Sequence, residues 1–207
     1  MPAMTYTSCF CLLFALLLPA CAATKPAQKS MYHKVGNSVP RQSSLGFAIS
    51  PPSGEGWFER LKDDSLIYLK RTEKDSYSIF TQATEISLRG VSPRPDSLAS
   101  FVRQRKSSEI QARKYVNASL EVGQGNPPFN CVRYTLTYED HGVKSLKGED
   151  YVKVANKGVF CFNPSAPQHG IEVSYQERSL ASARTTSYRN EGEYFLASLQ
   201  IGKPIVK

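Results

Sequence analysis

Apolar and polar side chains alternate over short runs from residue 45 onward, which is the pattern of half-buried β-strands. The runs are rich in Ile, Val, Tyr, Phe and Thr, and Gly, Pro, Ser and acidic residues separate them. A hairpin is predicted near residues 73–75. We predict strands over residues 45–49, 65–71, 77–88, 118–122, 131–138, 150–154, 157–162 and 171–176.

Helical spacing first occurs after the Pro-rich turn at residues 92–96. The prolines disfavour a helix before this point, and the Asp96 carboxylate is placed to accept amide hydrogens of the first turn. One face of this helix is basic. The buried stripe on its other face is predicted to contain Leu98, Phe101, Val102, Ile110 and Ala112.

A second helix is predicted at the end of the chain. It begins at Asn190, where Glu193 can complete a pair like the capping box, and its apolar face contains Phe195, Leu196 and Leu199. Strands and single helices without regular strand-helix-strand alternation favour an antiparallel β-sheet flanked by helices, which is an α+β fold.

The first twenty residues contain no Asp, Glu, Lys or Arg, and residues 10–18 form an apolar run. The run is too short to span a bilayer, which needs about 20 residues, and is typical of a secretory signal peptide over residues 1–20. It is followed by Pro19, Ala20 and Cys21, so the segment LPAC resembles the bacterial lipobox. This resemblance implies that Cys21 is acylated, becomes the first residue of the mature protein and anchors it to the membrane.

Two features of this segment differ from the lipobox pattern, because Pro19 replaces a small or aliphatic residue and the n-region has no Lys or Arg. The alternatives are an ordinary signal peptide cut near Ala20 or Ala23, and a buried hydrophobic segment of a cytosolic protein. Ala22, where Asp is absent, resembles lipoproteins of the outer membrane. We therefore expect an outer membrane lipoprotein facing the periplasm, with a soluble secreted or periplasmic protein as the alternative.

The chain of 207 residues is predicted to contain one folded domain. Residues 21–44 have few large apolar side chains and no periodicity, so they are interpreted as a lipidated N-terminus and a flexible tether. Residues 45–202 form a single globular α+β domain in this interpretation, and residues 203–207 form a tail.

The chain contains five cysteines, which is an odd number for an exported protein. Cys9 and Cys11 lie in the predicted signal peptide, and Cys21 takes the lipid. Cys131 and Cys161 remain, both within predicted strands of one sheet, and an exported protein meets an oxidising compartment. We predict a disulfide between these two residues, and the alternative is a pair of buried reduced thiols.

Several short motifs follow one another along residues 45–200. They are a strand ending in proline, Gly-x-Gly-Trp, a helix after a Pro-rich turn, Cys-Val-Arg-Tyr, Gly-Val-Phe-Cys and Ser-Tyr-x-x-Arg at residues 174–178. This order resembles uncharacterised bacterial envelope proteins and, more remotely, the PsbP-like α/β/α sandwich. The resemblance implies an accessory binding protein rather than an enzyme, and it transfers no catalytic residues.

The sequence lacks the P-loop, the dinucleotide-binding glycine motif, His-Glu-x-x-His, Gly-x-Ser-x-Gly and Cys-x-x-Cys. An exported hydrolase that uses a free Cys161 with His169 or His141 is the alternative function. A disulfide at Cys161 would remove its nucleophile. Acidic and His side chains at residues 139–141 and 149–150 offer ligands for a cation, but they are more typical of solvated turns. We predict no catalytic residue, metal or cofactor.

The formal net charge is +8, and residues 1–20 carry no charged side chains, so processing leaves the side-chain balance unchanged. A basic surface on such a protein attracts an anionic envelope component or another envelope protein. The alternative is a solvated face with excess Lys and Arg and no partner. Export and the lack of a known motif argue against nucleic acid. We therefore predict a lipid-anchored, non-enzymatic binding or accessory module. The surface predicted to meet an anionic partner consists of basic residues around the first predicted helix, which are Arg103, Arg105, Lys106, Arg113 and Lys114.

Overall fold

The computed structural model describes residues 32–44, 46–62, 65–71, 77–124, 130–142, 148–164, 166–182 and 187–202. All of these residues belong to one compact unit, Met31–Lys207. The predicted signal peptide, Cys21, the predicted hairpin at residues 73–75 and the predicted tail at residues 203–207 lie outside the described residues.

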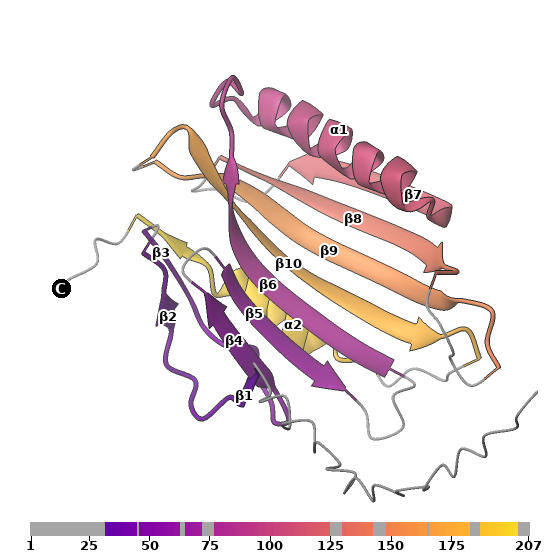
Figure 1. Cartoon of the computed structure of the whole chain (residues 1–207). Coiled ribbons are helices and arrows are strands. Elements are labelled where there is room, and N and C mark those ends of the chain that lie inside the picture. Colours follow the sequence, from indigo (N-terminus) through magenta and orange to yellow (C-terminus); the bar gives the residue numbers. More distant parts are fainter. Residues whose placement is uncertain are drawn as a thin grey trace, which may run out of the picture. The chain divides into compact units, whose positions relative to one another are not determined.

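Among the described residues, eight strands form one antiparallel sheet in the order β1-β4-β5-β6-β10-β9-β8-β7 (Figure 1). A smaller sheet of three strands, again within the described part, has the order β11-β3-β2. The large sheet contains β1 (His33–Lys34), β4 (Phe58–Lys62), β5 (Ser65–Arg71), β6 (Tyr77–Ser87), β7 (Val116–Gln124), β8 (Cys131–Asp140), β9 (Val152–Phe162) and β10 (His169–Leu180). The smaller sheet contains β2 (Arg41–Gln42), β3 (Phe47–Ile49) and β11 (Gln200–Ile201).

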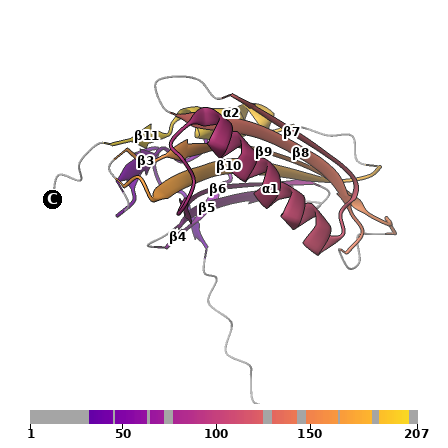
Figure 2. The same cartoon turned by 90° about the horizontal axis from the view of Figure 1, so that it is seen from above.

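The described part of the chain contains two helices, α1 (Pro95–Arg113) and α2 (Arg189–Ala197), which contact opposite faces of the large sheet (Figure 2). On β10, Glu172 contacts Lys106 of α1, whereas the ring of Tyr175 packs against Gly192 of α2. Because side chains alternate along a strand, positions 172 and 175 point to opposite faces. The protein therefore has a mostly-β α+β fold, and the predicted antiparallel sheet with flanking helices is confirmed.

Each face of the sheet buries its own apolar cluster. On the α2 side, Trp57 is almost fully buried, and the rings of Tyr68 and Phe195 meet edge to face with centroids 5.6 Å apart. On the α1 side, Leu98 of the helix packs in a cluster that includes Phe160 of β9. The sheet is thus the common wall between two cores.

Glu191 attaches α2 to the large sheet near β4 and β5. Trp57 Nε1 donates a hydrogen bond to Glu191 Oε2 at 2.7 Å, and Lys70 Nζ lies 2.8 Å from both carboxylate oxygens. The Lys70 ammonium also lies 4.0 Å from the ring centroid of Tyr188, just before α2. The tryptophan of the Gly-x-Gly-Trp motif therefore has a structural role in docking α2.

Several predicted strands match the structure. Residues 65–71 form β5 with the predicted bounds, and β6 ends one residue before the predicted end. The segments 150–154 and 157–162 form one strand, β9, because Ala155 and Asn156 continue the pairing with β8 and β10. The sequence pattern does not predict β4, whose residues FERLK are mainly polar and charged.

Helix α1 begins slightly before the predicted capping residue. Arg94 occupies the N-cap position without a side-chain hydrogen bond, so Asp96 lies within the first turn and does not cap the helix. The Asp96 carboxylate still stabilises the helix, because its negative charge lies near the positive end of the helix dipole. In the predicted buried stripe, Leu98 and Val102 are buried, Phe101 and Ile110 are half-buried, and Ala112 is exposed.

Helix α2 also begins one residue early, with Tyr188 at its N-cap and no side-chain capping bond. Glu193 does not form the predicted capping pair, because it accepts a hydrogen bond from Tyr175 Oη at 2.8 Å. Phe195 and Leu196 are buried as predicted, while Leu199 follows the helix and is half-buried.

The folded unit begins before residue 45, within the segment interpreted as a tether. Strand β1 pairs with β4, and β2 pairs with β3. Arg41 also forms an ion pair with Glu59, in which Nε and Oε2 are 3.1 Å apart. Strands can pair through backbone hydrogen bonds without large apolar side chains, so the composition of this segment does not predict β1 and β2.

Candidate functional site

Helix α1 changes polarity along the stripe that faces the sheet. Its buried residues are Leu98, Val102 and Lys106, which are spaced four residues apart. Residues at this spacing lie on one side of a helix, so all three face the sheet. The first half of α1 therefore buries apolar side chains, whereas the second half buries a lysine that needs polar partners.

Strand β10 supplies polar partners on the face that it turns toward α1. Positions along a strand alternate between the two faces of a sheet. The side of β10 toward α2 carries Ile171, Val173 and Tyr175, whereas the side toward α1 carries Glu172, Ser174, Gln176 and Arg178. These residues are not predicted to form a site, although this alternation of apolar and polar positions is the signal in the sequence that marks a polar surface inside the fold.

Lys106 and Glu172 form a buried ion pair. Lys106 Nζ lies 2.9 Å from Glu172 Oε1, and the two side chains are only 5% and 6% exposed. Lys106 Nζ also lies 3.3 Å from Glu109 Oε2, and Tyr134 Oη donates to Glu172 Oε1 at 2.8 Å. Burial and the nearby Glu172 carboxylate raise the pKa of Tyr134 well above its ordinary value, which keeps the phenol protonated as a donor.

Gly158 allows Tyr134 to reach Glu172. Gly158 lies directly opposite Tyr134 in the β8–β9 pair, and a Cβ atom at this glycine would lie 2.5 Å from Cε1 of the tyrosine ring. The ring therefore occupies the space that any larger residue at position 158 would need. The glycine of the Gly-Val-Phe-Cys motif is thus explained by close packing of a side chain over the strand.

A polar cavity with a volume of about 320 Å³ lies between the second half of α1 and strands β6, β8, β9 and β10. Four basic and three acidic side chains line it, which gives a formal excess of one positive charge. The charged lining residues are Arg105, Lys106, Glu109, Arg113, Asp140, Glu172 and Arg178. The other lining residues are Phe80, Gln82, Tyr115, Tyr138, Asn156 and Gln176.

Ion pairing within the cavity leaves two guanidinium groups without a direct partner. Lys106 has two carboxylate partners, and Arg178 Nη2 lies 2.9 Å from Asp140 Oδ2. Arg105 and Arg113 are exposed and have no hydrogen bond or ion pair within the part of the chain that the structure describes. These two arginines are available to an anion that enters the cavity.

Two tyrosines form another part of the cavity wall. The rings of Tyr115 and Tyr138 are stacked, with centroids 3.6 Å apart. Burial, and then a hydrogen bond with Tyr115, raise the pKa of Tyr138 above its ordinary value. The stacked pair therefore adds aromatic surface and phenol groups beside the charged groups.

The five predicted basic residues do not form one exposed surface. Arg105, Lys106 and Arg113 line the cavity, whereas Arg103 and Lys114 lie outside it. Arg103 Nη2 donates to the Val122 carbonyl oxygen at 3.3 Å, and Lys114 is the left-handed C-cap of α1. The placement of Lys106 on the outer face is wrong, because this residue continues the buried stripe.

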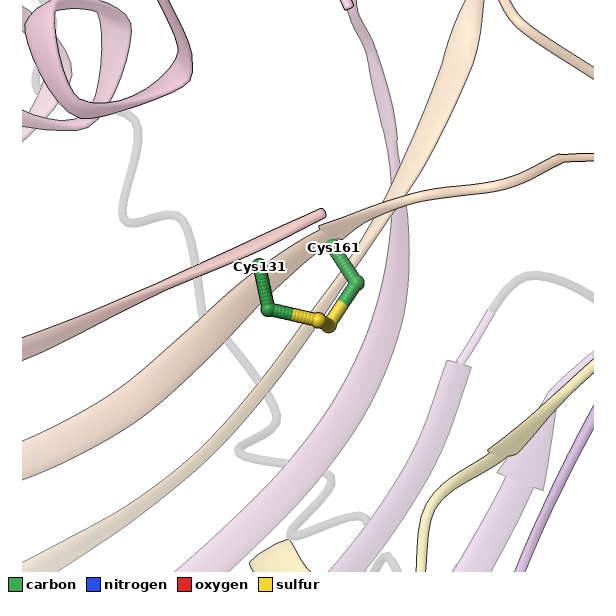
Figure 3. Close-up of a disulfide and its surroundings, with 2 residues drawn as sticks. All are labelled: Cys131 and Cys161. Carbon is green, nitrogen blue, oxygen red and sulfur yellow. A yellow bond between two sulfur atoms is a disulfide. The ribbon is translucent and has the colours of Figure 1, made fainter. Parts of the chain in front are cut away.

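Cys131 and Cys161 lie directly opposite each other on β8 and β9 and form a disulfide (Figure 3). The Cα atoms of the two residues are 4.1 Å apart, and both side chains belong to the buried cluster on the α2 side. The predicted disulfide is therefore confirmed, and Cys161 is not a free thiol.

The two histidines of the alternative hydrolase have other partners. His169 begins β10, and its Nδ1 contacts a carboxylate oxygen of Glu85. His141 Nε2 lies 3.2 Å from Glu139 Oε2. No hydrogen bond or ion pair among the described residues joins either histidine to Cys161. The arrangement that a Cys-His nucleophile requires is absent from this part of the chain.

The acidic residues at the ends of β8 and before β9 are engaged separately. Hydrogen bonds from Asn117 and then from His141 lower the pKa of Glu139, and the Glu149 carboxylate accepts a hydrogen bond from Ser182. Within the described residues, no three His, Cys, Asp or Glu side chains are grouped so as to hold a metal ion.

No described helix has the length and apolar character needed to cross a membrane. No protein-family model matches the sequence, and no curated protein shows significant similarity to it.

Proposed function

We propose that this protein is a lipid-anchored component of the bacterial cell envelope that acts as a non-enzymatic binding or accessory module. The Cys131–Cys161 disulfide is the observation that carries the proposal. Disulfides persist in oxidising compartments such as the periplasm, so the pair supports export. The same bond occupies the Cys161 sulfur that the alternative hydrolase would use as its nucleophile, which favours binding over thiol catalysis.

The lipid anchor is assigned to Cys21, within the lipobox-like segment LPAC. Acylation would hold the folded unit at the membrane without a spanning helix. The absence of Asp at position 22 favours the outer membrane, with the folded unit facing the periplasm.

The proposed fold is a PsbP-like α/β/α sandwich. The contacts of α1 and α2 with opposite faces of one antiparallel sheet support this assignment. The resemblance implies an accessory binding role, and the polar cavity beside α1 supplies a place where a component of the envelope can bind.

The anchor is tested by expressing the full chain and its Cys21→Ala variant in a bacterium that processes lipoproteins. We expect the wild-type protein in the membrane fraction, with metabolic incorporation of labelled palmitate. Cys21→Ala should lose the label and leave the membrane fraction, because neither processing nor acylation can occur at this position. The matched control is Cys11→Ala, which removes a cysteine from the same segment and should change nothing.

Two results would contradict the proposal. Unchanged membrane retention and electrophoretic mobility of Cys21→Ala would refute the lipid anchor. Two free thiols in the mature protein under non-reducing conditions would refute the disulfide as the basis for export and would favour the hydrolase.

A further inference from the structure

We infer that the cavity beside α1 binds a small, hydroxylated monocarboxylate of single-ring size, such as a sugar acid. This inference rests on the proposed binding function and assigns its ligand class. It follows from the charge of the cavity, from the uncharged groups of its lining and from its size.

The cavity has a formal excess of one positive charge, which a ligand with one negative charge would neutralise. Its lining has one more basic than acidic side chain, and the basic groups without a direct ion-pair partner are the guanidinium groups of Arg105 and Arg113. A guanidinium group matches a carboxylate well because its parallel N–H donors fit the two oxygens. A phosphate monoester is less suitable, since it carries about −1.5 to −2 charges at neutral pH and would face three carboxylates in the wall.

The uncharged lining indicates what the rest of the ligand carries. Gln82, Asn156 and Gln176 each offer an amide group, and Tyr115 and Tyr138 offer phenol groups. An amide both donates and accepts hydrogen bonds, which suits the hydroxyl groups of a sugar. An apolar ligand would leave these groups unpaired on binding, which is costly.

The size of the cavity limits the ligand. Its volume of about 320 Å³ is at the lower end of the range for small-molecule sites, which is about 300–1,000 Å³. A single hydroxylated ring with one carboxylate is therefore a better match than an oligosaccharide. The buried Lys106–Glu172 pair forms a fixed polar part of the wall, whereas exposed Arg105 and Arg113 receive the carboxylate.

The test uses the full-chain protein purified from membranes in a non-ionic detergent, with D-glucuronate as the probe. Ligand-observed NMR and titration calorimetry measure binding, and the NMR spectrum after long incubation reports any turnover. We expect saturable binding of glucuronate, weaker binding of glucose 6-phosphate and no binding of glucose. Absence of glucuronate binding at millimolar concentration, or equal binding of glucose, would overturn the inference.

The cavity is located by a pair of matched double variants. Arg105→Gln/Arg113→Gln removes two charges from the cavity, and Arg103→Gln/Lys114→Gln removes two charges from the same helix outside it. All four side chains are exposed, so we expect both proteins to fold. The first variant should bind glucuronate roughly 10- to 100-fold more weakly, as expected for loss of hydrogen bonds to a charged group, and the second should bind normally. Equal losses in both variants would indicate diffuse surface charge and refute the site.

Failure of the ligand assignment can be distinguished from failure of the proposed function. If Cys21→Ala leaves the membrane but glucuronate does not bind, the anchored accessory role stands and the ligand class is wrong. If glucuronate binds and is chemically converted, the non-enzymatic role is wrong, although the cavity is still the binding site.

Discussion

Replacing Lys106 with Met tests whether the buried ion pair beneath α1 stabilises the fold. The substitution keeps a long side chain in the buried stripe but leaves the Glu172 carboxylate without its cation. The two side chains are 5% and 6% exposed, so water can compensate little for the loss. At their 2.9 Å separation, the Coulomb attraction is about 6 kcal/mol at an effective dielectric constant of about 20, before desolvation is subtracted.

The net effect on stability is smaller than this attraction. Removing one partner from a buried pair costs about 3–5 kcal/mol. We expect about 3 kcal/mol for Lys106→Met, near the lower limit, because Tyr134 still donates to Glu172. The double variant Lys106→Met/Glu172→Gln removes both charges and should lie within about 1 kcal/mol of the wild type, since replacing both partners of a buried pair is often nearly neutral.

Urea unfolding followed by tryptophan fluorescence measures these differences. The single tryptophan, Trp57, is 1% exposed in the folded protein, so unfolding should change its emission strongly. The free energies of the wild type, Lys106→Met, Glu172→Gln and the double variant form a cycle that isolates the coupling between the charges. A cost below about 0.5 kcal/mol for Lys106→Met, or a double variant as unstable as the sum of the single variants, would refute the reasoning.

Three further predictions concern other parts of the same fold. Gly158→Ala should lower the free energy of unfolding by about 1–3 kcal/mol because its Cβ would meet the Tyr134 ring, whereas Gly123→Ala, with no atom within 4 Å of its Cβ, should have little effect in the same urea assay. The double variant Cys131→Ser/Cys161→Ser should lose about 3–4 kcal/mol, the value for a loop closed across 30 residues, and reductant should destabilise the wild type but leave this variant unchanged. The contribution of the buried tyrosines to stability should be constant up to the ordinary tyrosine pKa of 10 and be lost above it, because buried phenols with raised pKa values ionise first in the unfolded chain, and urea midpoints that do not decrease between about pH 9 and about pH 11 would contradict this. The tyrosines concerned are Tyr68, Tyr77, Tyr134, Tyr138 and Tyr175.

Much of the sheet can be predicted from the sequence because its central strands carry long alternating runs of side chains. The strand at residues 65–71 can be predicted from its own residues. The Cys131–Cys161 disulfide can be predicted from the number and positions of the cysteines. Strand β4 and the short β1 escape prediction. β4 pairs with the next strand, β5, and with the distant β1, and this pairing uses backbone hydrogen bonds, which composition does not reveal.

The cavity could be predicted only in part. The basic residues of α1 are visible in the sequence, but their charge suggests an exposed face. The spacing from Leu98 through Val102 to Lys106 contains the correct information, because it places the lysine on the buried side. Its partner Glu172 is 66 residues away, and only the fold brings the two together.

The position of the Cys131–Cys161 bond also restricts how β8 and β9 can pair. A slip of one residue between two strands turns every side chain of the slipped strand to the other face. Because the two cysteines are opposite each other, the bond permits one register between β8 and β9. That register keeps Tyr134 and Asn156 on the side of α1, so oxidation locks in the alignment that builds the cavity wall.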